Sequence, residues 1–152
     1  MTSQTDEVKF FAHGLPAPKG SYRPVDGRSR DGRPVTRLVP MSRREKEWRT
    51  RVAVAFRQAF PGWMPVDKDY ACEVSEIFYL VRPKAARDRN WPNRTPDLDK
   101  LQRCLHDALT DAGLWQDDSM VCGVQAAKRY VETAGEAGVS VMVRFYPNNL
   151  VK

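Results

Sequence analysis

The period of the apolar positions changes along the chain and predicts two helices. In the first run, apolar residues recur every three or four positions and the run ends at Pro61-Gly62: Trp48, Val52, Ala55, Phe56 and Ala59. In the second run the stripe is longer, and Gly113 follows it as a natural C-terminal cap: Leu98, Leu101, Leu105, Ala108, Leu109 and Ala112. Both runs therefore predict amphipathic helices with one face turned toward a core.

Alternation with a period of two predicts strands over residues 8–12, 71–82, 119–131 and 139–145. The elements then follow one another as strand, helix, strand, helix, strand and strand. This order predicts an α+β fold in which two main helices pack on a mixed sheet of about four strands. Residues 16–40, which are interrupted by prolines and glycines, are predicted to be irregular, and residues 83–96 to form a basic loop.

Length and composition place the chain among small globular proteins. Its 152 residues, 41% of them apolar, suit a single domain over residues 1–152. The longest apolar stretches have about five residues, too few for a membrane span, and the N-terminus lacks the pattern of a secretion signal. The odd count of three cysteines fits neither a disulfide framework nor a metal site. We therefore expect a cytoplasmic protein that has no membrane partner.

The charge of the chain is unevenly distributed. The net charge is +6, but residues 19–51 carry eleven Lys and Arg against four Asp and Glu. Residues 82–94 carry five basic residues and one acid, whereas residues 95–118 carry six Asp against one Lys and one Arg. The two basic segments favour a polyanion such as nucleic acid over an ordinary solvated surface. Arginine predominates in the first, which favours bidentate phosphate contacts.

The acidic segment between Pro96 and Val121 carries the candidate chemistry. If the helix begins at Lys100, with Asp99 as its N-cap, Asp97 and Asp99 lie on extended chain and share one side. Asp118 lies beyond the other end of a helix that is about 20 Å long, so only a return of the chain can bring it back. Carboxylates without nearby His or Cys suit Mg²⁺ or Mn²⁺. The alternative is ordinary: acids at a helix N-terminus and an Asp-Asp turn.

The same segment resembles a known family. Asp97-Leu98-Asp99-Lys100-Leu101, Asp107-Ala108-Leu109-Thr110 and Gly113-Leu114-Trp115, followed by Asp117-Asp118-Ser119, are similar to the signature of the RusA family of Holliday-junction resolvases. Residues 15–20 and 128–130 resemble flanking parts of the family more weakly. The resemblance implies that Asp97, Asp99 and Asp118 bind Mg²⁺, for which Mn²⁺ can substitute, and that a homodimer cuts four-way DNA junctions by paired nicks in recombination and repair.

The family also implies a catalytic lysine at a position where this chain has Arg103. Arginine does not give up its proton, so Arg103 can hold a phosphate but cannot transfer a proton; an ion pair with Asp99 is the equally simple alternative. Lys100 is the candidate for the missing ammonium group. Lys128 lies about 33 Å beyond Asp118 along an extended strand, so we expect it to contact a distant phosphate or the other subunit.

The remaining candidates concern DNA and two isolated polar residues. We expect these basic residues to bind the arms of a junction: Lys19, Arg23, Arg87, Arg89, Arg94 and Lys128. Trp91 either stacks on a base or anchors its loop. Glu76 is either a fourth carboxylate near the metal or an edge residue that reaches solvent, and His106 is expected to face solvent. The alternative hypothesis is a non-catalytic protein that binds branched DNA. The sequence has no glycine-rich motif of the kind that binds phosphates, so we expect no small-molecule cofactor.

Overall fold

The fold is built on one four-stranded sheet. The computed structural model describes residues 6–20, 22–40 and 43–149. Within the sheet the strands are ordered β1 (Glu7–His13), β6 (Gly138–Pro147), β4 (Tyr70–Val81) and β5 (Val121–Val131). β6 is antiparallel to both β1 and β4, whereas β5 is parallel to β4. The predicted mixed sheet and the α+β class are thus confirmed.

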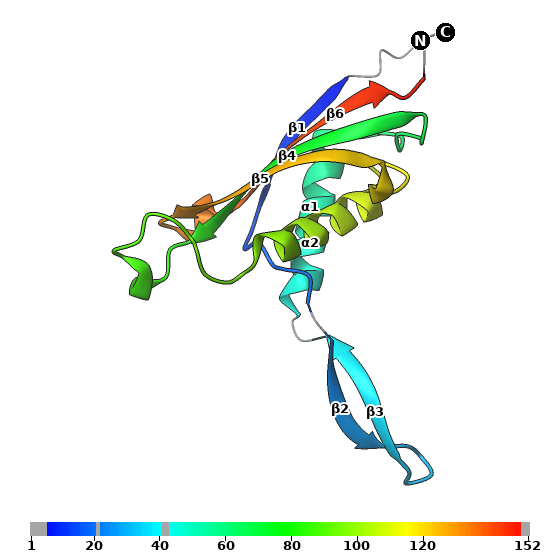
Figure 1. The fold of residues 1–152 in the computed structure, drawn as a ribbon, viewed down its shortest axis with the longest axis vertical. Helices are drawn as coiled ribbons and strands as arrows, with labels where there is room; N and C mark the ends of the chain where they lie inside the picture. Colours follow the sequence, from blue (N-terminus) through cyan, green and yellow to red (C-terminus); the bar gives the residue numbers. More distant parts are fainter. Residues whose placement is uncertain (1–5, 21, 41–42, 150–152) are drawn as a thin grey trace.

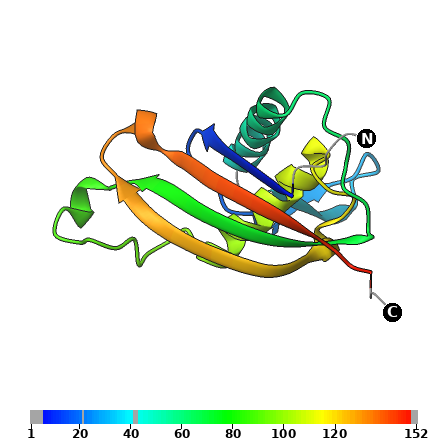
Figure 2. The ribbon, with the colours of Figure 1, turned by 90° about the horizontal axis from the view of Figure 1, so that it is seen from above.

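Two helices cover one face of this sheet (Figures 1 and 2). α1 (Arg44–Ala59) follows the N-terminal part of the chain, and α2 (Leu98–Ala112) connects β4 to β5. Gly113 ends α2 in the left-handed conformation, with φ of 81°, as the sequence predicts. None of the described helices is both long and apolar enough to cross a membrane.

The core lies between the helices and the sheet. Most residues of both predicted helical stripes point into it, although Ala55 is half-buried and Ala59 exposed. The strands add alternate side chains, among them Val74, Phe78, Val141 and Val143. Two tryptophans, Trp48 and Trp115, are each only 1% exposed. Because α2 is the crossover between two parallel strands, it must run antiparallel to them and return the chain across the sheet. This geometry decides which end of α2 meets which end of β5.

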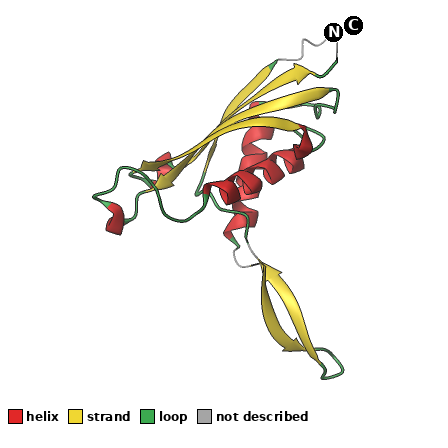
Figure 3. Cartoon of the chain, in the orientation of Figure 1, coloured by secondary structure: helices red, strands yellow, loops and turns green. Residues whose placement is uncertain are grey.

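The prediction of an irregular segment over residues 16–40 is wrong for most of its length. β2 (Tyr22–Arg28) and β3 (Pro34–Pro40) pair as an antiparallel hairpin that projects from the body of the protein (Figures 1 and 3). Its turn is closed by hydrogen bonds between Ser29 and Arg33 and from the Gly32 N–H to the Ser29 carbonyl. Prolines are tolerated here because both strands of a two-stranded ribbon are edge strands.

Three short 3-10 turns complete the described chain: Lys84–Ala86, Asp118–Met120 and Ala134–Glu136. The first interrupts the predicted basic loop between β4 and α2. The second lies just before β5, which therefore begins two residues later than predicted. Asp118 thus belongs to a tight turn and not to a strand.

Candidate active site

Asp97 and Asp99 lie at the N-terminal end of α2. The helix begins at Leu98, with Asp97 as its extended N-cap residue (φ −69°, ψ 138°), so the predicted start at Lys100 is wrong. The earlier start lets Leu98 pack against the core, and the Leu101 N–H donates to the Asp97 carbonyl at 3.1 Å. Asp99 is therefore a helical residue of the first turn and not the cap.

Both carboxylates are open to solvent and each has a basic neighbour on the same helix. The Lys100 Nζ lies 3.7 Å from Asp97 Oδ2, and the Arg103 guanidinium lies 4.0 Å from Asp99 Oδ2. The side chains of Asp97 and Asp99 are 54% and 63% exposed, so each pair stabilises the helix by only about 0.5 kcal/mol or less. Of the two roles open to Arg103, the structure shows the ion pair.

Asp117 and Asp118 form a second acidic pair in the turn before β5. The backbone N–H of Ser119 donates to Asp117 Oδ1 and lowers the pKa of that carboxyl group. Burial, followed by a hydrogen bond with Asp117, raises the pKa of Asp118. The pKa values of the two adjacent carboxyl groups therefore move in opposite directions, because two negative charges this close do not ionise with equal ease.

The two acidic pairs are separated along α2. Asp118 interacts electrostatically with Asp107 and His106, in the second half of the helix, and Asp107 is about 12 Å of helix rise beyond Asp99. Across residues 6–20, 22–40 and 43–149, no three His, Cys, Asp or Glu side chains form a group that could hold a metal ion. A metal site shared by Asp97, Asp99 and Asp118 therefore stays a prediction.

β5 brings Lys128, and not Asp118, to the start of α2. The Lys128 Nζ donates to the carbonyl oxygens of Arg94 and Pro96, each at 2.9 Å, in the last residues before Asp97. The predicted contact of Lys128 with a distant phosphate or the other subunit is not tested, but its ammonium group already binds the chain that leads into α2. β5 separates Lys128 from Asp118, but the strand runs back along α2 and carries Lys128 to the end of the helix where Asp97 and Asp99 lie.

Glu76 and His106 form a buried pair between β4 and α2. Glu76 is 1% exposed, and its Oε2 lies 3.0 Å from His106 Nε2. The His106 side chain is only 13% exposed and lies edge-on to the Trp115 ring. Glu76 belongs to a central strand, so neither the predicted escape of Glu76 to solvent nor a solvent-facing His106 is correct. The sequence offered one signal: a glutamate on a core face needs a partner.

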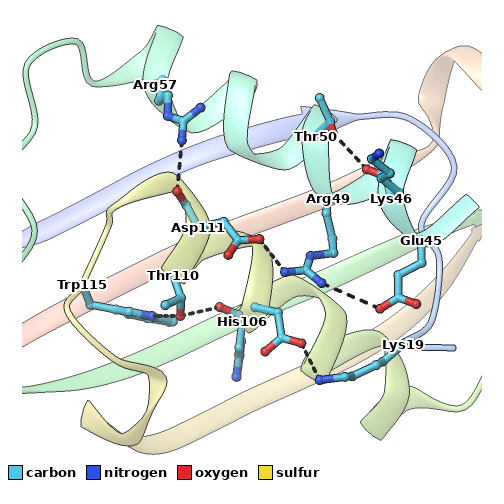
Figure 4. Close-up of polar contacts among 11 residues, drawn as sticks. Lys19, Glu45, Lys46, Arg49, Thr50, Arg57, His106, Thr110, Asp111 and Trp115 are labelled. Carbon is cyan, nitrogen blue, oxygen red and sulfur yellow. Dashed lines mark hydrogen bonds and ion pairs between the residues drawn. The ribbon is translucent and has the colours of Figure 1, made fainter. Parts of the chain in front are cut away.

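The opposite side of α2 is tied to α1 and to the N-terminal segment (Figure 4). Lys19 Nζ donates to Asp107 Oδ2 at 2.7 Å, which raises the pKa of Lys19. Arg49 pairs with Asp111, and Arg57 donates to the Asp111 carbonyl. The predicted DNA contact of Lys19 is not tested, but its ammonium group is already engaged by a carboxylate.

The remaining predicted DNA-binding residues lie on the hairpin and on the basic loop over residues 83–96. Arg87 and Arg94 are exposed and Arg89 is half-buried, whereas the side chain of Arg23 lies outside the described residues. Trp91 is 60% exposed, and the Arg129 guanidinium lies 4.7 Å from its ring centre, so Trp91 is not a packed anchor of its loop. The hairpin turn adds three arginines, called here the hairpin-turn arginines: Arg28, Arg30 and Arg33.

The fold and these surfaces define an α+β protein with an acidic helix start set between two arginine-rich projections, an arrangement suited to a phosphodiester polyanion. The sequence profile of the endodeoxyribonuclease RusA family matches residues 17–144. The chain belongs to this family of nucleases. It is also 25% identical, over 95% of its length and 96% of the relative's, to the crossover junction endodeoxyribonuclease RusA of Aquifex aeolicus (strain VF5).

Proposed function

We propose that this protein is a Mg²⁺-dependent endonuclease that resolves four-way DNA junctions by paired nicks, as a homodimer, in recombination and repair. Membership of the RusA family supports the nuclease activity. The observation that carries the proposal is the pair of solvent-open aspartates at the start of α2, close to three cationic side chains from α2 and β5.

The donor set at this end of α2 fits the proposed metal. Mg²⁺ is usually held by one or two protein carboxylates, with water and substrate phosphates completing its shell, so Asp97 and Asp99 suffice as protein ligands. When bound, the ion supplies an activated water and neutralises charge on the phosphate. Mn²⁺ shares this preference for oxygen ligands and would substitute. Asp118 joins the set only if DNA binding or a second subunit brings it to Asp97.

The cationic residues would bind and orient the DNA. Lys100 and Arg103 lie within one helical turn of the two aspartates and would hold the scissile phosphate. Contacts from Arg87, Arg89 and Arg94, with those proposed for Lys19, Arg23 and Lys128, would follow the arms. A two-stranded ribbon can enter the major groove of B-DNA, so the projecting hairpin suits a duplex arm. Such contacts give affinity without sequence selection.

A four-way junction is nearly two-fold symmetric, which is the reason for proposing a homodimer. A two-fold dimer would place one helix start against each of two opposed strands. Light scattering coupled to size exclusion should give a mass of about twice 17.4 kDa. A monomeric mass, both alone and on an uncut junction, would remove the paired-nick part of the proposal.

The proposed activity is tested on a synthetic four-way junction with Mg²⁺ or Mn²⁺. Wild-type protein should cut two opposed strands, whereas Asp97→Asn, Asp99→Asn and Asp118→Asn should bind the junction and leave it intact. Asp88→Asn, which removes an exposed acid from the neighbouring basic loop, is the control and should cut normally. If wild-type protein binds without cutting, the chain is a branched-DNA-binding protein that lacks nuclease activity.

A further inference from the structure

Leu98 and Leu101 pack the start of α2 against the core, and one side chain of β5 adds hydrogen bonds to it. Among the described residues, Lys128 alone provides hydrogen bonds between β5 and the residues that lead directly into α2. Its ammonium group bridges two carbonyl oxygens, those of Arg94 and Pro96, at 2.9 Å each. Other hydrogen bonds of the preceding loop join residues of the loop to one another or to Arg82 at the end of β4. The Arg82 guanidinium donates to the Arg89 carbonyl, and the Asn93 N–H donates to the Trp91 carbonyl.

The ion pairs of Asp97 and Asp99 do not connect the start of α2 to the sheet. Both pair with cations on α2 itself, at 3.7 and 4.0 Å, so those pairs move with the helix and say nothing about its place on the sheet. Asp97 also makes no side-chain capping bond. A further hydrogen bond of the first turn runs from the Lys19 N–H to the Lys100 carbonyl, on the side of the N-terminal segment.

Helix stabilisation does not explain this position of a lysine. The N-terminal end of a helix carries partial positive charge and favours anions, so an ammonium group there is electrostatically unfavourable. Lys128 is nevertheless held there by two charge-assisted hydrogen bonds, which are among the stronger kinds in proteins. A role in orienting the chain that enters α2 accounts for the arrangement.

We propose that Lys128 is a positioning residue: by gripping the Arg94 and Pro96 carbonyls, it sets where Asp97 and Asp99 stand relative to β5. The functional consequence rests on the proposed metal-dependent nuclease activity, because it matters only if these two carboxylates bind a divalent ion. The structural part, an ordered start of α2, does not depend on that activity.

The sign of the metal effect separates positioning from charge. Removing a cation close to two carboxylates should strengthen Mn²⁺ binding if Lys128 acts only through its charge. If it positions the carboxylates, its removal should weaken Mn²⁺ binding about tenfold or more, as is typical for residues that orient metal ligands. Lys128→Met and Lys128→Gln remove the same charge, but glutamine keeps a hydrogen-bond donor.

The experiment compares these variants with Arg129→Met. Arg129 is the next residue of β5, carries the same charge and contacts the same loop at Trp91, farther from Asp97. Mn²⁺ affinity is measured by calorimetry on the full chain without DNA. Hydrogen exchange of peptides covering residues 97–105 is measured without metal. Thermal unfolding shows that each variant is folded.

Positioning predicts weaker Mn²⁺ binding and at least tenfold faster exchange in Lys128→Met, an intermediate effect in Lys128→Gln and little change in Arg129→Met. Unchanged exchange, or Mn²⁺ affinity that is equal or higher in Lys128→Met, would overturn the inference. If Lys128→Met does not fold, Lys128→Gln decides in the same way. If wild-type protein binds no Mn²⁺, the proposed metal dependence fails, and the exchange data still decide the role of Lys128.

Discussion

Replacing Glu76 by methionine should stabilise the protein, although it removes a hydrogen bond from the core. The Glu76 side chain is 0% exposed and only one of its oxygens has a partner, His106 Nε2 at 3.0 Å. The other oxygen, Oε1, has no hydrogen-bond partner in the described part of the chain. A buried acceptor in this state costs about 1–3 kcal/mol.

The expected size of the effect follows from these two oxygens. Methionine has a similar volume and no acceptor to satisfy, so the unfavourable Oε1 disappears, while one hydrogen bond of about 1 kcal/mol is lost. The remaining imidazole of His106 keeps 13% exposure and can reach water. We expect a net gain of about 1 kcal/mol in the free energy of unfolding, or roughly 2–4 °C in Tm for a chain of this length.

The reverse perturbation should be far more damaging. His106→Leu keeps an apolar contact with Trp115 but leaves both oxygens of Glu76 buried without a partner, which should cost about 2–4 kcal/mol. In the double variant the cost should vanish, because no buried carboxyl group remains. A coupling free energy of about 2–4 kcal/mol is therefore expected from the double-mutant cycle.

Urea unfolding followed by far-UV circular dichroism measures these differences, provided that the four proteins share one m-value. Glu73→Met is the matched control. Glu73 lies on the same strand, is exposed and accepts a hydrogen bond from Tyr146, so its replacement should change stability by less than about 0.5 kcal/mol. A Glu76→Met variant less stable than wild type by 1 kcal/mol, or a coupling near zero, would refute the reasoning.

Three further predictions use other parts of the molecule. Because the pKa of Asp118 is raised, its ionised form is unfavourable in the folded protein. Asp118→Asn should therefore raise Tm by about 1–2 °C at pH 7. The gain should fade in thermal scans toward pH 3, where wild-type Asp118 is protonated. Changing the three hairpin-turn arginines to glutamine should reduce the slope of log K against log salt by up to about 2.7 for junction binding; an unchanged slope would exclude the hairpin from the interface. Burial raises the pKa of Cys72 to about 11 and that of Cys104 to about 12. A thiol reagent at pH 8 should therefore modify Cys122 alone in the folded protein. Equal labelling of all three cysteines in mass spectrometry would contradict the burial.

Local patterns in the sequence were enough to predict the main elements of the fold. Helical and strand periods depend on which side chains face a core, and most residues of the two predicted helical stripes are buried, from Trp48 to Phe56 and from Leu101 to Leu109. The family signature lies in one short segment of α2 and the turn after it, so it was readable without the fold. The hairpin was not predicted because prolines and glycines normally interrupt strands. Both strands of a two-stranded ribbon are edge strands, where proline is tolerated.

The contacts across the sheet were decided by the tertiary structure alone. The order of elements predicted a mixed sheet but not which strands are neighbours. The parallel pairing of β5 with β4 makes α2 run in the opposite direction and sets Lys128 beside Pro96. It also leaves Asp118 beside the second half of α2, away from Asp99, and brings Glu76 to His106. The candidate chemical residues could be predicted from local sequence, because side-chain chemistry is local. Their meeting in space depends on strand direction, which is a property of the assembled sheet.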